Sequence, residues 1–408
     1  MQDAPFPARG RYADGFEPVA RTFAAHLERG EEVGAGLTVF FRGACVVDVW
    51  GGLADVASQR PWEEDTRIVV FSVTKGLAAM AFLLLAERGA FDWDAPVSAY
   101  WPGFARGGKE AVSVRTLLNH RAGLCALDRP LTMADCVRED ATDRLRDAIE
   151  AQRPKWEPGA SQGYHAITFG MYARELFERV AGEPMGPFLQ RELFEPLGSD
   201  VRLGTPPELD AKIATLVTPS VGERLSGMLG VALRRPGCTE ARVLRAALAR
   251  RSLVRGAFGN PKLDPRGLRA YNEPPIRRAQ LAWASATASA RGLARAYLPF
   301  AGGGRHESRT FVREDRVSPI YERQSWSERD RVLQKPLGWS QGFLKEDAGV
   351  FGPTREAFGH AGMGGALGWC DPVHGLALGY VMNRMDWRVR SPRALALCRA
   401  LYECEPVR

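Results

Sequence analysis

The sequence has few cysteines and histidines for its length, and neither residue type is spaced like a metal site. Its 408 residues contain seven cysteines, with no Cys-x-x-Cys pair, and six histidines, with no His-Glu-x-x-His. An odd number of unpatterned cysteines predicts free thiols in a reducing compartment rather than a disulfide framework. Zinc sites need ligands at regular spacing, so metal catalysis has little support and no cofactor is implied.

Long apolar runs are also missing. No uninterrupted apolar run approaches the roughly 18 residues of a membrane span, and the N-terminus lacks the basic and apolar regions of a signal peptide. We therefore expect a cytoplasmic protein without membrane insertion. The apolar content of 45% and the charged content of 25% are ordinary for a globular protein of this length.

The formal net charge of +7 raises the question of a nucleic-acid partner. The excess is mainly arginine spread along the chain, and it is densest at residues 242–255, where alanine and leucine interleave at helical spacing. This pattern predicts a solvated helix face. We therefore expect no nucleic-acid partner.

Strand-like segments occur near both ends of the chain. After an amphipathic helix at 16–27, two β-rich runs at 36–41 and 44–50 flank a two-residue turn, which is the spacing of a hairpin. The strand-like runs near the C-terminus cover residues 338–344, 357–360, 366–370 and 376–382, before a closing helix at 391–402. One sheet can therefore be assembled from both chain ends.

The middle of the chain is predicted to be mainly helical. The expected helices begin after residue 72 and at residue 113, and cover about 140–152, 164–181 and 187–194. Residues 204–282 contain proline and glycine clusters with weak periodicity, which predicts a partly irregular cover.

These patterns predict an α/β fold in which an antiparallel sheet flanked by helices is built from both chain ends. Residues 1–408 are expected to form a single catalytic domain. Its α/β lobe would cover residues 10–75 and 335–408, and a mainly helical lobe at 76–334 would be inserted between them. A site would form in the cleft between the lobes.

A Ser-x-x-Lys motif is the most informative feature of the chain. Ser72 and Lys75 stand at the start of a small-apolar stretch that predicts a helix, and residues three apart share one helix face. The hydroxyl and the amine can therefore lie within hydrogen-bond reach, as an activated nucleophile requires. Burial and the positive end of the helix dipole disfavour an ammonium, so Lys75 is a candidate base. The alternative is that Ser72 only caps the helix.

Two further motifs supply candidate partners for Ser72. Tyr164 follows a Trp-Glu-Pro-Gly loop and can present its phenol at a loop-to-helix junction. His360 opens the run His-Ala-Gly-Met-Gly-Gly, in which Gly362 and Met363 lie between two strand-like runs. Glycine there lets a substrate approach and leaves backbone N–H groups free to hold an oxyanion. The alternatives are a core tyrosine and a plain turn.

In this order, the three motifs resemble those of the serine β-lactamase and penicillin-binding-protein superfamily. The segment Thr-Leu-Leu-Asn-His-Arg-Ala-Gly at 116–123, the Trp-x-Pro-Gly loop at 156–159 and a helix start at 285–295 are also similar to segments of class C-like members. The resemblance spans most of the chain, and it implies a β-lactamase/transpeptidase-like fold.

Two departures locate the chain within that superfamily. Ala166 stands where class C β-lactamases have an asparagine that binds the amide side chain of the drug, and His360 stands where they have lysine. A lysine is a constant cation that attracts a substrate carboxylate, whereas an unperturbed histidine is mostly neutral at pH 7. Similar variants occur among class VIII carboxylesterases. The resemblance therefore implies a serine carboxylesterase that acts on small uncharged esters.

The resemblance also implies acyl transfer through a covalent intermediate on Ser72. Either Lys75 or Tyr164 would take the serine proton, and Tyr164 would protonate the leaving alkoxide. The backbone N–H groups of Ser72 and Met363 would hold the oxyanion, with His360 beside the substrate. An acyltransferase on the same site, a β-lactamase or D-peptidase, and a homologue with a degenerate site remain alternatives, and the oligomeric state is open.

A rival nucleophile, Ser161, lies in a Gly-x-Ser-x-Gly pentapeptide of the α/β-hydrolase type. That motif needs a buried strand before the serine, but the preceding segment is a polar, proline-containing loop. We therefore prefer Ser72. Three aromatic residues near the last strands, Trp339, Phe343 and Trp369, are candidates for an acyl pocket, with core packing as the alternative.

Overall fold

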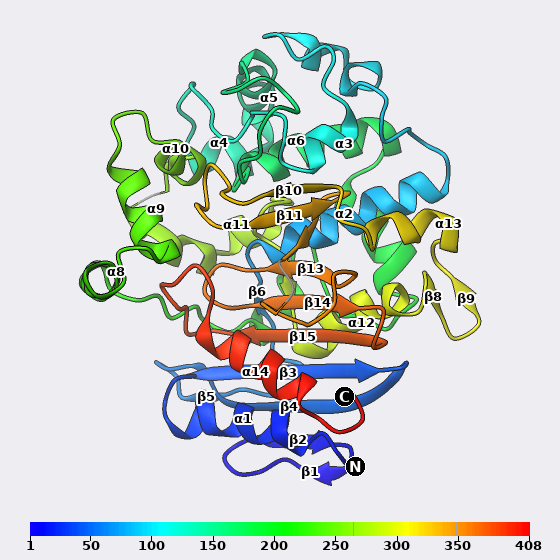
Figure 1. The fold of residues 1–408 in the computed structure, drawn as a ribbon, viewed down its shortest axis with the longest axis vertical. Helices are drawn as coiled ribbons and strands as arrows, with labels where there is room; N and C mark the ends of the chain where they lie inside the picture. The colour runs from blue at the N-terminus through cyan, green and yellow to red at the C-terminus, as the bar shows by residue number, and fades with distance from the viewer. Residues whose placement is uncertain (264, 347–348) are drawn as a thin grey trace.

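The computed structural model describes residues 1–263, 265–346 and 349–408, and its central feature is one antiparallel sheet (Figure 1). Within these residues the sheet has eleven strands, in the order β1-β2-β4-β3-β15-β14-β13-β12-β11-β10, with β5 paired to β4. The strands are β1 (Gln2–Asp3), β2 (Arg9–Tyr12), β3 (Gly34–Phe41), β4 (Ala44–Asp55), β5 (Arg60–Pro61), β10 (Ser325–Ser327), β11 (Leu337–Ser340), β12 (Phe343–Lys345), β13 (Phe358–Ala361), β14 (Leu367–Asp371) and β15 (Leu376–Met382). The N-terminal and C-terminal strands meet where β3 pairs with β15, so the predicted assembly from both chain ends is confirmed.

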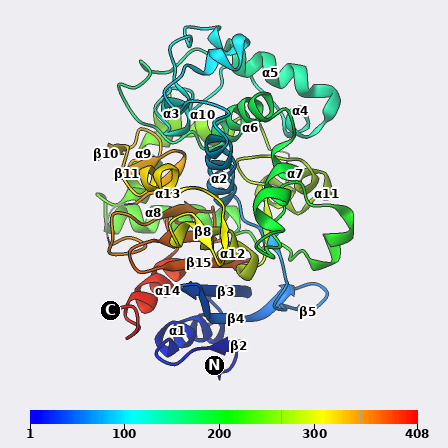
Figure 2. The same ribbon diagram turned by 90° about the vertical axis from the view of Figure 1, so that its right-hand side faces the viewer.

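The sheet separates two layers, because alternate residues of a strand point to opposite faces. Along β15, Leu376, Leu378 and Tyr380 join the core beneath α1 (Glu17–Glu28) and α14 (Pro392–Tyr402). Ala377 and Val381 join the larger core on the opposite face. Figure 2 shows α1 and α14 on one side of the strands, and α12 (Ala290–Ala301) on the other.

The helix that follows Ser72 is the centre of the larger core. Every residue of α2 (Val73–Glu87) from Val73 to Ala86 is buried, as expected of a helix that is apolar on all sides. α12 lies against β15, and Gly379 makes this contact possible, because a Cβ there would lie 2.2 Å from the carbonyl oxygen of Ala290. α2 itself contacts β12, β13 and β14, and Gly76 in its first turn lies next to His360 of β13.

The remaining helices form the second lobe and its cover. They are α3 (Val114–Leu118), α4 (Met133–Val137), α5 (Thr142–Ala151), α6 (Thr168–Ala181), α7 (Met185–Leu189), α8 (Val221–Arg234), α9 (Thr239–Leu248), α10 (Leu253–Gly259), α11 (Pro274–Arg278) and α13 (Glu314–Val317). Two short two-stranded sheets pair β6 (Ile68–Val69) with β7 (Thr287–Ala288) and β8 (Arg305–His306) with β9 (Arg309–Thr310). The cover at 204–282 is more helical than predicted, because serine or cysteine side chains cap α8, α9 and α10 despite the nearby prolines.

Two predicted boundaries differ in an informative way. The run 338–344, predicted as one strand, is a hairpin of β11 and β12. Gln341 and Gly342 both have positive φ, of 47° and 89°, as the central residues of a type I′ turn do. The helix predicted from residue 164 begins at Thr168 instead, which leaves Tyr164 on the loop before it. The division into an α/β lobe and a helical lobe stays a prediction. Two elements within residues 76–334 lie outside a helical lobe, since β10 belongs to the sheet and α12 to the layer that flanks it.

All seven cysteines are free thiols, as predicted. Among the described residues, no helix is both long enough and apolar enough to cross a membrane.

Candidate active site

Ser72 stands immediately before the first turn of α2. Phe71, the preceding residue, is held at a φ of 46°, a left-handed value that is uncommon for a bulky side chain. The hydroxyl of Ser72 makes no capping hydrogen bond to the helix, although the residue occupies the N-cap position. The capping alternative therefore does not account for Ser72, and its hydroxyl is available for other contacts.

Lys75 lies beside Ser72, as the helical spacing predicted. Its Nζ is 2.9 Å from Ser72 Oγ and 3.1 Å from the carbonyl oxygen of Trp283. The side chain is fully buried, and within the described part of the chain it has no carboxylate among its hydrogen-bond partners. Burial lowers the pKa of Lys75 well below its usual value, since a charged amine is costly away from water. A neutral amine in contact with the serine hydroxyl can accept its proton.

Tyr164 faces the same pair from the loop before α6. Its ring stacks on Trp339, with 4° between the ring planes and 5.7 Å between centroids, and Lys75 Nζ is 5.1 Å from the Tyr164 ring centroid. Burial raises the pKa of the phenol well above its usual value, although a hydrogen bond with Ser72 and the charge of Arg390 both lower it. Tyr164 is therefore a protonated phenol at neutral pH.

The loop that carries Tyr164 is fixed by a buried carboxylate. Asp330 Oδ1 accepts hydrogen bonds from the backbone N–H groups of Tyr164, Val332 and Leu333, at 2.8–3.0 Å. Asp330 is fully buried and lies 166 residues from Tyr164 in sequence. No local sequence signal indicated this contact, which holds the tyrosine in place.

His360 lies on β13 at the edge of the same site. Its Nδ1 is 2.8 Å from the carbonyl oxygen of Ala361, so Nδ1 carries the proton and Nε2 is a bare acceptor. Nε2 is buried without a hydrogen-bond partner among the described residues. Burial, together with the nearby Lys75, lowers the pKa of His360 to about 3. The ring is therefore neutral at pH 7, as the comparison of histidine with lysine predicted.

A second buried histidine, His120, supports the tyrosine. Its ring centroid is 3.9 Å from that of Trp339 and 5.2 Å from that of Tyr164. Its Nδ1 accepts the backbone N–H of His165 at 2.9 Å, so the proton is on Nε2, which has no partner among the described residues. Burial lowers the pKa of His120, and the ring stays neutral. The motif at 116–123 thus packs against two residues that line the site, Tyr164 and Trp339.

The two backbone N–H groups predicted to hold an oxyanion have no hydrogen-bond partner within the described part of the chain. These are the N–H groups of Ser72 and Met363, and both residues line one pocket. The N–H of Gly362 is occupied, because it donates to the carbonyl oxygen of Ala366 at 2.6 Å. Gly362 instead permits a close approach, since a Cβ there would lie 2.4 Å from the carbonyl oxygen of Val70.

The pocket above Ser72 has a volume of about 390 Å³ and a mainly apolar lining. Its lining residues include Ser72, Tyr164, Met228, Val243, Val254, Phe258, Leu263, Leu268, Leu333, Trp339, Leu344, His360 and Met363. Trp339 thus lines the pocket as predicted, but Phe343 and Trp369 do not. Phe343 packs on Phe358 in the core, and Trp369 packs on Phe351. Phe343 points to the opposite face of the sheet from Trp339, whereas Trp369 shares the face of Trp339 but lies on β14, three strands away from β11.

Ala166 and Ser161 occupy different positions. Ala166 lines a smaller apolar pocket together with Ser72, Phe71 and Trp283, so the position where class C enzymes carry an amide is apolar here. Ser161 lies on the loop before α6, with neither a strand before it nor a helix directly after it. The nucleophile-elbow alternative therefore lacks its structural context.

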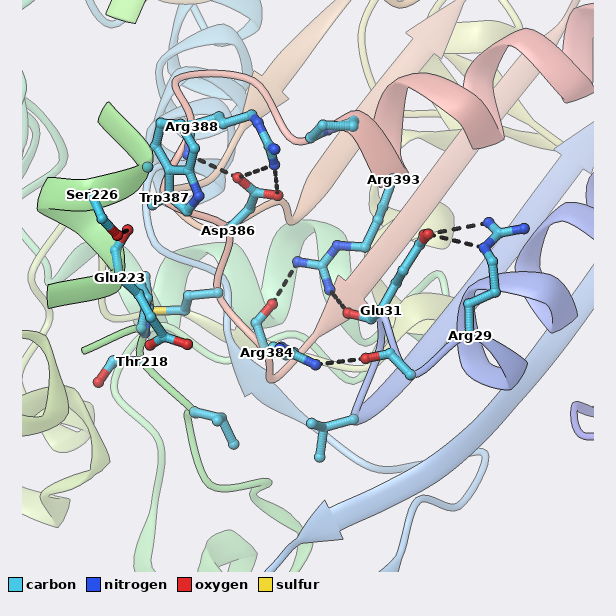
Figure 3. Close-up of a pocket in the computed structure, with 17 residues that line it drawn as sticks. Arg29, Glu31, Thr218, Glu223, Ser226, Arg384, Asp386, Trp387, Arg388 and Arg393 are labelled. Atoms are coloured by element: carbon cyan, nitrogen blue, oxygen red, sulfur yellow. Dashed lines mark hydrogen bonds and ion pairs between the residues drawn. The ribbon is translucent and has the colours of Figure 1, made fainter. Parts of the chain in front are cut away.

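A larger cavity, of about 810 Å³, lies elsewhere, and the residues that line it include no serine–lysine pair (Figure 3). Its arginines are engaged: Arg29 pairs with Glu31, and Arg388 pairs with Asp386. Arg393 pairs with Glu32, which is buried beside that cavity. Residues 385–388 line this cavity and also the pocket above Ser72, so the segment separates the two.

Arg390 is a further residue near the site that no sequence pattern indicated. Its buried guanidinium lines the pocket and pairs with Glu346, which also binds Lys335 at 2.9 Å. Burial lowers the pKa of Arg390 to about 10, so the side chain keeps its charge at neutral pH. The site therefore retains one buried cation although its β13 residue is a neutral histidine.

The sheet and its buried central helix define a β-lactamase/transpeptidase-like α/β protein. The family model described as Beta-lactamase matches residues 19–400, and the chain belongs to the Beta-lactamase family. The predicted resemblance and fold class are confirmed.

Known relatives include esterases. The chain is 33% identical over 375 residues to "Esterase/beta-lactamase LipL" of Mycobacterium tuberculosis, covering 91% of this chain and 81% of the relative. It is similar to the solved structure of a family VIII carboxylesterase, with a TM-score of 0.84, 32% identity, and coverage of 98% and 100% of the two chains. EstA from Arthrobacter nitroguajacolicus Rue61a is also similar, with a TM-score of 0.79, 28% identity and coverage of 96% and 97%.

Proposed function

We propose that this protein is a serine carboxylesterase that cleaves small uncharged esters through an acyl-enzyme on Ser72. The observation that carries the proposal is the buried pair of Ser72 Oγ and Lys75 Nζ, 2.9 Å apart, at the base of an apolar pocket. Similarity to a family VIII carboxylesterase and to an esterase/β-lactamase at about 30% identity supports the same chemistry.

The directions of the pKa shifts support Lys75 as the first proton acceptor. Burial lowers the pKa of the amine and raises that of the Tyr164 phenol, so the amine is the group that lacks a proton at neutral pH. As Ser72 Oγ attacks the ester carbonyl carbon, its proton passes to Lys75 Nζ. The new ammonium then lies close to the face of the Tyr164 ring, which stabilises a cation.

The carbonyl oxygen becomes an oxyanion held by the N–H groups of Ser72 and Met363. Preorganised donors of this kind contribute about 3 kcal/mol each to transition-state stabilisation. When the C–O bond of the ester breaks, the leaving alkoxide takes the Tyr164 proton, and the Lys75 ammonium restores that proton to the phenol. Water then attacks the acyl-enzyme by the reverse sequence of proton transfers, which releases the acid and regenerates Ser72.

The pocket lining supports an uncharged substrate with an apolar acyl group. His360 presents a neutral Nε2 acceptor where a lysine would present a cation. The buried Arg390 is already paired with Glu346. An apolar acyl chain would contact Phe258, Leu268 and Trp339 without leaving a charge unpaired.

A β-lactamase activity is the second candidate, because the relative at 33% identity is named as both an esterase and a β-lactamase. We propose that it is the minor activity, since Ala166 offers no amide to a β-lactam side chain. Transfer of the acyl group to an alcohol instead of water uses the same acyl-enzyme, and it would compete with hydrolysis.

The test is turnover of p-nitrophenyl esters, from acetate to octanoate, beside a chromogenic cephalosporin. We expect clear turnover of the esters, with cephalosporin turnover slower by at least about a hundredfold in kcat/KM, or about 3 kcal/mol. Faster turnover of the cephalosporin would contradict the assignment. Adding methanol or butanol and measuring the ester product would show how much acyl group is transferred.

A further inference from the structure

The cover formed by residues 221–259, which comprises α8, α9 and α10, exposes an unusual amount of apolar surface. On α8, Leu225, Leu229 and Leu233 are 52%, 52% and 83% exposed, and they recur every four residues. This spacing places all three on one stripe of the helix. Leu248 of α9 is 72% exposed. Three exposed leucines in one stripe are unfavourable in water unless another apolar surface covers them.

The same cover carries most of the excess charge of the protein. It contains eight arginines and two glutamates, so its net charge of +6 accounts for nearly all of the chain's +7. None of these arginines forms an ion pair with a carboxylate in the described part of the chain. Both glutamates are occupied by backbone groups: Glu223 accepts the N–H of Ser220, and Glu240 accepts the N–H of Val389. The positive charge is therefore not neutralised within the protein.

The geometry of α8 matches a helix that lies flat on a surface. The helix projects at one edge of the molecule beside α9 (Figure 1), and its 14 residues span roughly 21 Å. Arg224 and Arg235 fall on one side of the leucine stripe in the helical projection. Trp387 packs closely against Gly227, where a Cβ would lie 2.6 Å from the indole. Arginine beside an apolar stripe is typical of interfacial helices, whereas Trp387 lies on the opposite side of α8 from the leucines and packs the helix against the rest of the protein.

The charge distribution selects one occupant for this surface. A second copy of the chain would bring a net charge of +6 against +6, which is repulsive. We propose that the cover at 221–259 docks the protein on an anionic lipid surface, with the leucines of α8 in the boundary between headgroups and acyl chains and the arginines on the phosphates. This peripheral contact differs from a membrane span, and it does not depend on the proposed esterase activity.

The docking surface adjoins the pocket above Ser72. Arg224 and Met228 of α8, Val243 of α9 and Phe258 of α10 line that pocket from the inside of the cover. A protein docked through α8 therefore holds the cover, and with it one wall of the pocket, against the lipid.

The experiment is cosedimentation of the full chain with vesicles of phosphatidylglycerol, and separately with vesicles of phosphatidylcholine. We expect binding to phosphatidylglycerol that weakens with added salt, and at least about tenfold weaker binding to phosphatidylcholine. Leu229→Ser with Leu233→Ser should weaken binding at least about tenfold. Arg234→Gln with Arg235→Gln should weaken it about fivefold per arginine.

Matched controls lie outside the cover, on the β8–β9 hairpin at the opposite edge of the molecule (Figure 1) and on the turn between β14 and β15. Arg305→Gln with Arg309→Gln on the β8–β9 hairpin, and Val373→Ser, remove comparable exposed groups, and binding should be unchanged. Turnover of a soluble p-nitrophenyl ester should be equal in all variants, which shows that each is folded. Equal binding to the two lipids, no binding to either, or equal losses in cover and control variants would overturn the proposal. Self-association in sedimentation velocity that the leucine variants abolish would instead assign the surface to a second copy.

Discussion

The floor and the cover of the pocket differ in burial and in the pairing of their polar groups. The floor is made by the buried residues Lys75, Tyr164 and His360 and by the partly buried Ser72, which lie at hydrogen-bond or ring-contact distance from one another. The cover at 221–259 is largely exposed. Its arginines form no ion pair with a carboxylate in the described part of the chain, and several of its leucines are exposed.

The difference indicates that the floor carries the chemistry and that the cover contributes to binding. In the floor, burial shifts the pKa values of an amine and a phenol in opposite directions, which is what proton transfer at neutral pH requires. Exposed groups of the cover can be replaced with little effect on the chemistry. Substitutions in the floor should therefore change kcat strongly, and substitutions in the cover should change binding.

The largest expected effect is that of Ser72→Ala, which removes the proposed nucleophile. Ester turnover should fall by at least about a thousandfold, since loss of a serine nucleophile leaves only oxyanion and binding contributions. The matched control is Ser161→Ala, which removes the serine of the rival motif on an exposed loop and should retain turnover. Initial rates with p-nitrophenyl butyrate measure both variants. Loss of turnover in Ser161→Ala but not in Ser72→Ala would assign the nucleophile to Ser161.

Lys75→Met should separate activity from stability. Turnover should fall by about a hundredfold or more, because no base remains beside Ser72. The free energy of unfolding should rise by about 1 kcal/mol, because a buried amine is replaced by an apolar side chain of similar length. Chemical denaturation and initial rates measure the two quantities, and a variant that is less stable and still active would contradict the assignment.

The pH dependence of stability should change in the same variant. Burial holds the folded-state pKa of Lys75 below the 10.5 of the unfolded chain, so the unfolded chain binds the extra proton below pH 10.5. This contribution reduces wild-type stability as the pH falls through that window, by up to about 1.4 kcal/mol per pH unit until the folded-state pKa is reached. In Lys75→Met the slope of stability against pH should be shallower by that amount. Identical slopes would mean that Lys75 is charged in the folded protein.

A smaller effect is expected when His360 and Ala166 are replaced by the residues that class C β-lactamases carry at these positions. His360→Lys with Ala166→Asn supplies the cation and the amide that the chain lacks, and cephalosporin turnover should rise about tenfold, with ester turnover reduced. The single variants should each give part of the gain. No change in the ratio of cephalosporin to ester turnover would show that these two residues do not set the substrate preference.

The smallest effect is expected in the cover. Phe258→Ala removes a ring that lines the pocket, 6.4 Å from the Tyr164 ring. We expect KM for p-nitrophenyl octanoate to change about threefold to tenfold, with kcat nearly constant, because only uniform binding is altered. A loss confined to kcat would place Phe258 in the floor rather than the cover.

Sequence reasoning succeeded where a short motif sets the geometry. Helical spacing alone brings Ser72 to Lys75, and the strand-like run at 376–382 coincides with β15. It failed where distant residues decide the result. Asp330 anchors the Tyr164 loop from 166 residues away, and Arg390 enters the site from the segment before α14 without a local pattern.

The cover was the least predictable part of the fold for a related reason. Its helices begin at caps such as Ser220 and Ser252 amid glycine and proline, and they lack a buried stripe that would give a clear apolar period. The leucines that do repeat on α8 face outward, so their spacing predicts a helix but not what covers it. The cytoplasmic localisation that the sequence led us to expect stays a prediction.

The most direct test of the central claim is the mass of the Ser72 peptide after the enzyme is mixed with p-nitrophenyl butyrate and quenched in acid. We predict a butyryl adduct on the peptide that contains Ser72, present in the wild type and absent from Ser72→Ala. An adduct on any other residue, or full turnover with no adduct under burst conditions, would contradict it.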